Sequence, residues 1–186
     1  IAGPTVTTSV TDATCGNANG EAQVSASGGS GTYSYNWSNS PTATNAINTG
    51  LLAGSYIVTV TDGNACQAVD TVVVNNIAGP TVTTSVTDAT CGDTNGTATA
   101  TVTGGASPYT YFWNDPGAQT TSTATGLPAN QTYTVYVYDT NGCYKSADAF
   151  INNIAGPTVT TSVTDATCGN ANGEAQVSAS GGSGTY

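Results

Sequence analysis

The sequence predicts an all-β protein, and three observations lead to that fold class. Apolar and polar residues alternate with period two in many short segments, such as Tyr56-Ile57-Val58-Thr59-Val60-Thr61. Thr and Val, whose β-branched side chains favour the pleated surface of a sheet, are abundant. No stretch shows the apolar period of a helix. We therefore expect strands along the whole chain.

Short strands separated by turns predict the architecture. In the first repeat the expected strands are Thr5–Thr11, Glu21–Ser27, Thr32–Ser38, Thr42–Ile47, Ser55–Thr61 and Ala68–Val74. Gly, Asn, Asp and Pro, the residues that tight turns favour, lie between them. Six or seven short strands per repeat indicate tandem small antiparallel β-sandwiches of the immunoglobulin-like type.

Strict internal repetition defines the expected domains. The segment IAGPTVTTSVTDATCG begins at Ile1, Ile77 and Ile154. The predicted domains are an immunoglobulin-like repeat of one type at 1–76, a second type at 77–153, and an incomplete copy of the first type at 154–186. We expect the chain to be a window of a longer periodic polymer, and such a polymer to form an extended fibre.

The third repeat is expected to lack a core. Residues 154–186 repeat residues 1–33 without a change, but none of the later strands follows them in this sequence. Those strands would cover Val159, Val163 and Val177. We therefore expect this segment not to hold a fold unaided.

Composition and charge exclude several classes of function. The sequence has eleven carboxylates but only one cationic side chain, Lys145, and no histidine, so its net charge is −10. This excludes the basic surface that nucleic acid requires, so we expect no nucleic-acid partner. No apolar run approaches the roughly 20 residues of a membrane span. Nucleophile and phosphate-loop motifs are also absent and the carboxylates are scattered, so we expect no enzyme.

The five cysteines predict disulfides in an oxidising, extracellular setting, because CxxC pairs and histidine are absent. Cys15 and Cys66 belong to the first repeat, Cys91 and Cys143 to the second, and the partner of Cys168 is expected outside the window. With six strands, both cysteines of a repeat lie at one end of the sandwich and can bond to one another. With seven, they lie at opposite ends, and Cys15 faces Cys143. We predict bonds within repeats, since a small domain gains roughly 3–4 kcal/mol from its own disulfide.

Four aromatic residues are predicted to be structural. Tyr56 and Tyr133 each precede an alternating Val strand, as in a tyrosine corner, where the hydroxyl bonds back to nearby backbone. Trp37 and Trp113 end Tyr-x-Tyr-x-Trp segments. They could be core residues or stacking platforms for sugars, and the alternation favours the core.

Two acidic loops carry a candidate calcium site. Its oxygen ligands would come from the following residues: Asp12, Asn17, Asn19, Glu21, Asp62 and Asn64. The alternative is that these residues only form turns, which Asp and Asn favour in any case. No other cofactor is expected.

An ordered set of motifs recurs in both complete repeats. In the first repeat these are Cys15, Asn19-Gly20, Gly28-Gly29, Tyr33/Tyr35/Trp37, Gly50-Leu51, Tyr56, Asp62 and Cys66. In the second they are Cys91, Asn95-Gly96, Gly104-Gly105, Tyr109/Tyr111/Trp113, Gly126-Leu127, Tyr133, Asp139 and Cys143. This set resembles the SprB repeat of large secreted adhesins of Bacteroidetes. Two departures, Ala65 and Asn130, concern positions where a turn glycine is usual.

The resemblance implies a function. It implies an extracellular filament or adhesin at the cell surface, which in some members serves surface gliding. It also implies a candidate O-glycosylation site at Thr71, within Asp70-Thr71-Val72. The expected partners are further copies of the chain in a fibre and, as a second candidate, a surface polysaccharide. The alternative function is that of spacer or carbohydrate-binding modules in a secreted multidomain enzyme.

Overall fold

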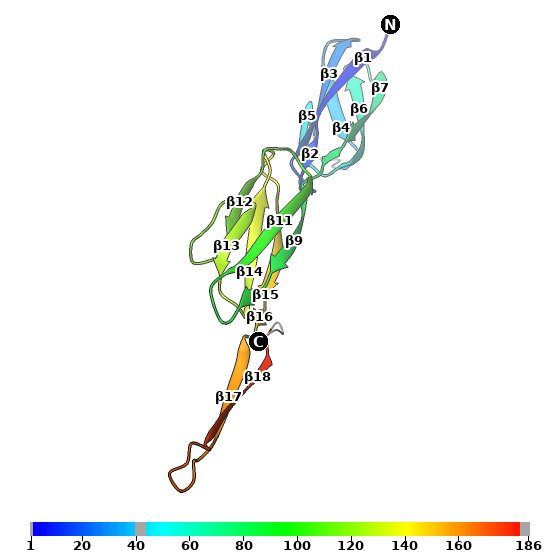
Figure 1. Cartoon of the computed structure of the whole chain (residues 1–186). Helices are drawn as coiled ribbons and strands as arrows, with labels where there is room; N and C mark the ends of the chain where they lie inside the picture. The colour runs from blue at the N-terminus through cyan, green and yellow to red at the C-terminus, as the bar shows by residue number, and fades with distance from the viewer. Residues whose placement is uncertain (1, 40–43, 183–186) are drawn as a thin grey trace. The chain divides into compact units, whose positions relative to one another are not determined.

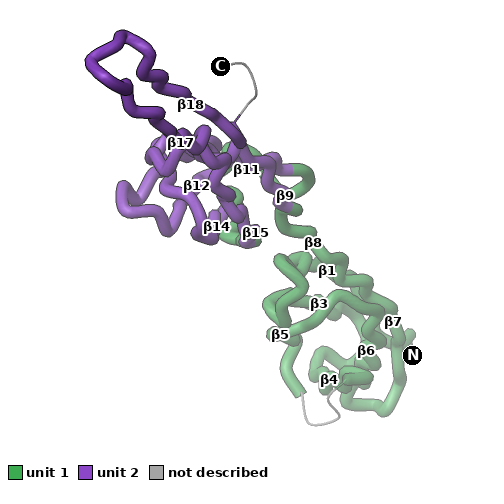
Figure 2. The backbone as a smooth tube through the Cα atoms, turned by 60° about the horizontal axis from the view of Figure 1, so that its bottom comes forward, with its two compact units in different colours: residues 1–81, 103–109, 138–145 green, residues 82–102, 110–137, 146–186 purple. Residues whose placement is uncertain are grey.

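The computed structural model describes residues 2–39 and 44–182 and is all-β, with no helix in these ranges (Figure 1). It therefore contains no helix of the length and hydropathy needed to cross a bilayer. The backbone forms two compact units (Figure 2). One comprises 1–81, 103–109 and 138–145, and the other comprises 82–102, 110–137 and 146–186. The repeat-based boundaries at 76/77 and 153/154 stay a prediction.

The first repeat forms two three-stranded sheets. Their strands are β1 (Pro4–Thr11), β3 (Gly20–Gly28), β4 (Tyr33–Trp37), β5 (Ile47–Leu51), β6 (Gly54–Asp62) and β7 (Gln67–Val74). One sheet has the order β1-β3-β5 and the other β4-β6-β7, with antiparallel neighbours. Alternate residues point inward, so Ala22 and Val24 of β3 meet Val58 and Val60 of β6 in one buried cluster around Trp37.

A short parallel pair extends this sandwich at one end. β2 (Ala13–Thr14) pairs with β8 (Asn76–Ile77), so that Ala13 lies opposite Asn76. The Ala13 N–H donates to the Asn75 carbonyl at 2.9 Å. The segment after β1 is thus held against the segment that leads into the second repeat.

The second repeat has corresponding strands. They are β9 (Pro80–Thr87), β10 (Ala89–Thr90), β11 (Gly96–Gly104), β12 (Thr110–Trp113), β13 (Thr123–Leu127), β14 (Gln131–Tyr138), β15 (Tyr144–Ile151) and β16 (Asn153–Ile154). The sheet orders are β13-β11-β9 and β12-β14-β15, with β10 paired to β16. The largest fully buried side chains of this repeat include Trp113, Leu127, Val135, Val137 and Ile151.

The third repeat is a bare hairpin of β17 (Pro157–Thr164) and β18 (Glu174–Gly181). Val159 is 58% exposed, Val163 74% and Val177 67%. No third strand pairs with this hairpin among the described residues. Its apolar side chains therefore remain in solvent.

The predicted strand Thr42–Ile47 is wrong in position. Residues 42 and 43 lie outside the described part, and the strand found is Ile47–Leu51. Its inward positions are Asn48 and Leu51, which are 6% and 1% exposed. Asn48 tolerates burial because its Nδ2 donates to Asn39 Oδ1 at 2.8 Å. A polar residue facing inward hides the alternation on which the sequence prediction depends.

Two consecutive strands of the first sandwich run in the same direction. β5 is antiparallel to β3, and β4 is antiparallel to β6. β3 ends at Gly28 and β6 at Asp62, and the Ser30 N–H donates to the Asp62 carboxylate at 3.1 Å, so both strands end at the same place. β4 and β5 must therefore point the same way. The expected alternation of direction along the chain fails at this connection.

Candidate functional site at a disulfide junction

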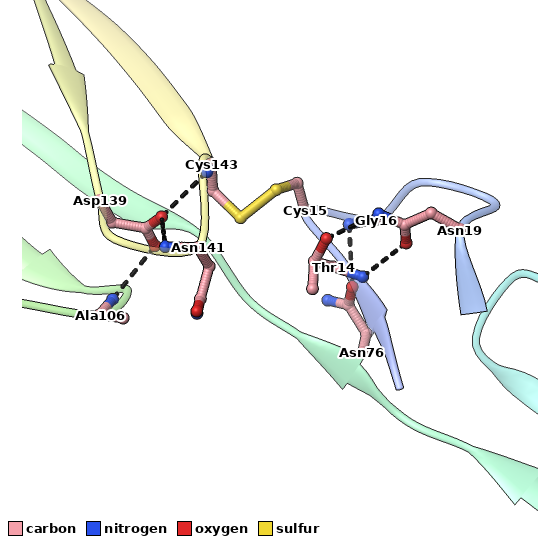
Figure 3. The surroundings of a disulfide bond; sticks show 9 residues. All are labelled: Thr14, Cys15, Gly16, Asn19, Asn76, Ala106, Asp139, Asn141 and Cys143. Atoms are coloured by element: carbon pink, nitrogen blue, oxygen red, sulfur yellow. Dashed lines mark hydrogen bonds between the residues drawn. A yellow bond between two sulfur atoms is a disulfide. The ribbon is translucent and has the colours of Figure 1, made fainter. Parts of the chain in front are cut away.

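A disulfide joins Cys15 of the first repeat to Cys143 of the second (Figure 3). Their Cα atoms are 5.3 Å apart, and 128 residues separate them in sequence. This Cα separation falls within the roughly 4.4–6.8 Å that a disulfide spans. The bond closes a covalent loop over most of both complete repeats.

Hydrogen bonds to β8 and to the side chain of Asn19 hold the turn that carries Cys15. The Cys15 N–H donates to the Ile77 carbonyl at 3.0 Å, and the Gly16 N–H donates to Asn76 Oδ1 at 2.8 Å. The Thr14 N–H donates to Asn19 Oδ1 at 2.8 Å, while Asn19 Nδ2 donates to Thr14 Oγ1 at 2.7 Å. These bonds stabilise a Cys15 backbone in the left-handed region, with φ of 59°.

A buried carboxylate holds Cys143. Asp139 is 7% exposed, and its Oδ1 accepts hydrogen bonds from the N–H groups of Asn141 and Cys143, both at 2.9 Å. Its Oδ2 accepts one from the Ala106 N–H at 3.1 Å (Figure 3). The carboxylate thereby fixes the turn that carries the cysteine. Cys143 itself is only 2% exposed.

The linker between the repeats passes directly against this bond. A Cβ on Gly79 would lie 2.7 Å from Cys143 Cβ and 3.5 Å from its Sγ. That separation is too short for any side chain, which explains the glycine of the segment IAGP at this position.

The predicted connectivity Cys15–Cys66 and Cys91–Cys143 is wrong. Cys66 directly precedes the first residue of β7. The Cys15 N–H, by contrast, donates a hydrogen bond to the Ile77 carbonyl, which lies just beyond the last residue of β7. An eight-residue strand separates them by about 25 Å, far more than a disulfide spans. Cys143, for its part, is already bonded to Cys15. The alternative arrangement, with bonds between repeats, is the one found.

The two tryptophans and two tyrosines predicted to be structural occupy structural positions, the tryptophans in the core and the tyrosines beside nearby backbone carbonyls. Trp37 and Trp113 are 0% exposed, and each indole N–H donates to a backbone carbonyl at 3.0 Å. Neither can therefore stack on a sugar. The Tyr56 hydroxyl donates to the Leu52 carbonyl at 2.7 Å, the bond of a tyrosine corner, and the Tyr133 hydroxyl reaches the Pro128 carbonyl at 3.2 Å.

The residues of the candidate calcium site are not brought together. Asp12 lies at the Cys15 end of the first sandwich, where its Oδ1 accepts the Asn75 N–H at 2.8 Å. Asp62 lies at the other end, beside Cys66, where its Oδ1 accepts the N–H groups of Asn64 and Cys66, both at 2.9 Å. Asn19 is engaged by Thr14. Asn17 and Glu21 are on the Asp12 side, since Glu21 pairs with Thr11. One ion cannot bind both groups.

The structure also bears on metal binding by other residues and on the accessibility of Thr71. Within residues 2–39 and 44–182, no three His, Cys, Asp or Glu residues are grouped to hold a metal ion. Thr71 lies in β7 with an exposed side chain, and its N–H donates to Asp70 Oδ1 at 2.8 Å. The hydroxyl is thus accessible to an enzyme, and its glycosylation stays a prediction.

Burial and hydrogen bonding shift three pKa values. Burial favours the neutral form of Asp62, but the N–H groups of Cys66, Asn64 and Ser30 outweigh it and lower the pKa below the usual 3.8. Asp115 is also buried, and its pKa is lowered by bonds from Gln119 and Gly117. The pKa of Tyr133 is raised by burial and then by the charge of Asp115.

Sequence reasoning missed the roles of the buried aspartates. Asp62, Asp115 and Asp139 each cap a turn, and Asp62 and Asp139 directly position the second cysteine of their repeats. A signal was present, because an Asp four residues before the second cysteine recurs in both complete repeats. The spacing matches an Asx-type turn rather than a metal ligand.

One known family matches the chain once in each of its three repeats. It is the SprB repeat, and its matches cover residues 7–42, 83–118 and 160–186. None of the curated proteins compared with the chain matches it.

Two solved structures resemble the fold. One comprises three N-terminal domains of the Highly Immunogenic Outer Capsid protein (Hoc) of bacteriophage RB49. It is 16% identical, with a TM-score of 0.49, and the match covers 95% of this chain and 69% of that one. The other is a 282-residue C-terminal fragment of intimin, in complex with the intimin-binding domain of the translocated intimin receptor. It is 14% identical, with a TM-score of 0.41, and the match covers 84% and 66% of the two chains.

Proposed function

Because the chain belongs to the SprB repeat family, which it matches in three segments, we propose that it is a structural repeat segment of a long extracellular surface filament or adhesin. The family match supports the coarser part of this statement, a repeat segment of a surface protein. The filament role goes beyond that match.

The Cys15–Cys143 bond is the observation that carries the proposal. It connects two successive repeats by a covalent path that bypasses the linker Ile77–Pro80. A load applied to the chain ends would then pass through the disulfide, and the 128-residue span between the two cysteines would not extend. Such a bond persists in oxidising environments, which fits a location outside the cell.

A soluble carbohydrate-binding role has less support. Both tryptophans are fully buried, so the exposed aromatic platform that sugar stacking requires would have to come from other residues. Among the described residues, the exposed aromatic side chains, such as Phe112 and Tyr144, lie in the second repeat.

The proposal is tested on intact cells that produce the protein. Antibody against the 186-residue chain, detected by immunogold electron microscopy, should label strands that extend from the cell surface. The variant Cys15→Ser/Cys143→Ser should be exported equally but release more label into the medium on shearing, because its junctions depend on the linker alone. Ser9→Ala, at an exposed position of β1 away from the disulfide, is the control and should behave as the unmodified chain.

Two outcomes would contradict the proposal. Label seen only after permeabilisation would exclude an extracellular role. Label found only on a soluble protein in the medium, bound to polysaccharide, would favour modules of a secreted enzyme.

A further inference from the structure

Two other cysteines hold the same structural positions as the bonded pair. Cys66, Cys91 and Cys168 are free thiols in the described part of the chain. We propose that Cys91 and Cys66 are preformed halves of further disulfides of the Cys15–Cys143 kind, each completed by the complementary cysteine of another copy of the repeat. The occupant is thus a second copy of this sequence.

The half-site around Cys91 reproduces that around Cys15. The Cys91 N–H donates to the Ile154 carbonyl at 2.8 Å, and the Gly92 N–H donates to Asn153 Oδ1 at 2.9 Å. The Thr90 N–H donates to Asn95 Oδ1 at 2.8 Å. The Cys91 φ is 56°, against 59° for Cys15. Every interaction that presents the Cys15 sulfur for bonding is therefore present at Cys91.

The half-site around Cys66 reproduces that around Cys143. Asp62 Oδ1 accepts the N–H groups of Asn64 and Cys66 at 2.9 Å, and its Oδ2 accepts the Ser30 N–H at 3.1 Å. The Asp62 N–H donates to the Cys66 carbonyl at 2.9 Å, as the Asp139 N–H does to the Cys143 carbonyl. The turn around Cys66 thus needs no rearrangement to accept a partner.

Glycines of the repeated IAGP segment lie against both unbonded cysteines. A Cβ on Gly3 would lie 3.3 Å from Cys66 Cβ, and one on Gly156 would lie 3.3 Å from Cys91 Sγ. Gly79 occupies the same position beside Cys143 in the bonded junction. The approach of Gly3 to Cys66 is therefore a third feature that the Cys66 half-site shares with the bonded junction, where Gly79 approaches Cys143.

Accessibility distinguishes the unbonded half-sites from the bonded one. Cys143 is 2% exposed in its disulfide, whereas Cys66 is half-buried and Cys91 is exposed. The disulfide joins Cys15, the earlier cysteine of its repeat, to Cys143, the later cysteine of the next repeat. By this rule Cys91 requires the later cysteine of the repeat that follows it, and Cys66 requires the earlier cysteine of a repeat that precedes it.

Bond formation proceeds by thiol–disulfide exchange with a small-molecule disulfide. One protein thiolate attacks the small disulfide and releases one small thiol, forming a mixed disulfide. The second protein thiolate then attacks the protein sulfur of that mixed disulfide and releases the other small thiol. Two protein thiols are thereby oxidised, and one small disulfide is reduced to two thiols.

The inference deepens the proposed function, on which its biological meaning rests. Cys91 lies between Cys15 and Cys143 in sequence, so a bond from Cys91 to the next repeat would begin inside the existing covalent loop. Successive loops would overlap, and no single backbone cleavage within them would separate the polymer.

The test lengthens the chain after Tyr186 by a second copy of residues 34–76, which completes the third repeat. Cys66→Ser in the original copy makes the added cysteine identifiable. After oxidation with oxidised glutathione, the protein is cut before Asp under non-reducing conditions and mapped by mass spectrometry. We expect peptide Asp88–Gly92 linked to the added copy of Asp62–Val69, together with the Cys15–Cys143 linkage. The control Cys91→Ser should lose only the first of these.

Defined outcomes would overturn the inference. One is the added cysteine joined to Cys168 of its own repeat. Another is that the added cysteine and Cys91 both remain thiols while Cys15–Cys143 forms.

A second lengthened chain applies if the added segment shows no amide protection. The chain is then lengthened before Ile1 by a copy of residues 77–153, and Cys66 must bond the added copy of Cys91. The peptide mapping detects disulfides only, and the surface labelling detects location only. Either experiment can therefore contradict its own proposal while the other proposal stands.

Discussion

The first and third repeats begin with the same 33 residues, form the same hairpin, and bury it to very different extents. β1 pairs with β3 from Pro4 opposite Gly28, and β17 pairs with β18 from Pro157 opposite Gly181. The two registers are identical over all eight pairs. Strand pairing in this segment is therefore encoded locally.

Burial is not encoded locally. Val24 is 2% exposed in the first repeat, whereas its copy Val177 is 67% exposed. The difference arises because Val58, Val72 and other residues of β6 and β7 cover the first hairpin. A sequence segment thus fixes its turns and register, while its contribution to stability depends on strands that follow tens of residues later.

Completion of the third repeat should have the largest effect on this difference. Appending residues 34–76 after Tyr186 should give β17 and β18 the cover that β1 and β3 have. Their amide exchange should slow by roughly a hundredfold or more, since exchange would then require opening of a folded domain. Hydrogen exchange followed by mass spectrometry measures this. Equal protection of 157–181 and 4–28 in the 186-residue chain would contradict the comparison.

A matched pair of substitutions should give the next largest effect. Val24→Ala removes two buried methyl groups from a packed core and should lower the free energy of unfolding by about 2 kcal/mol. Val177→Ala, in the same local sequence, should change it by less than about 0.5 kcal/mol. Urea denaturation followed by far-ultraviolet circular dichroism measures both, because it reports on the strands of all three repeats, whereas residues 154–186 contain no tryptophan. A similar loss in the two variants would mean that the third hairpin is covered in solution.

A smaller effect should appear as a pH dependence found only in a complete repeat. The folded state lowers the Asp62 pKa below 3.8, so its carboxylate contributes stability above the unfolded pKa. That contribution is lost as the pH falls below about 4 and through the folded pKa. Asp62→Asn should therefore be less stable than the unmodified chain at pH 7, and the gap should narrow at pH 3. Urea midpoints at both pH values test this, and a gap that widens in acid would exclude the mechanism. Residues 157–181 contain no counterpart of Asp62 and should show no such dependence.

Much of the fold is predictable from the sequence because its signals are local. Alternation correctly identifies β3, β4, β6 and β7 to within two residues. The tyrosine before an alternating Val strand predicts the bond from Tyr56 to Leu52. In each case the residues that decide the structure lie within one strand or one turn.

The strand β5 and the disulfide connectivity are not predictable in the same way. β5 buries Asn48 and contains Gly50, so its composition resembles that of a turn. Misplacing it by a few residues hides the fact that β4 and β5 run in the same direction. The connectivity depends on that direction, because it decides whether Cys15 and Cys66 share an end of the sandwich. One local error thus propagates to a long-range bond.

The position of Cys15 also imposes an order on folding. During synthesis from the N-terminus, both cysteines of the first repeat emerge before Cys143 exists. Once β7 forms, it holds Cys15 and Cys66 about 25 Å apart, so the early domain cannot trap itself in a premature bond. The correct disulfide must wait until β14 and the turn held by Asp139 are complete. The oxidation state of Cys15 therefore reports, for each chain, whether the next repeat has formed β14 and the turn that carries Cys143.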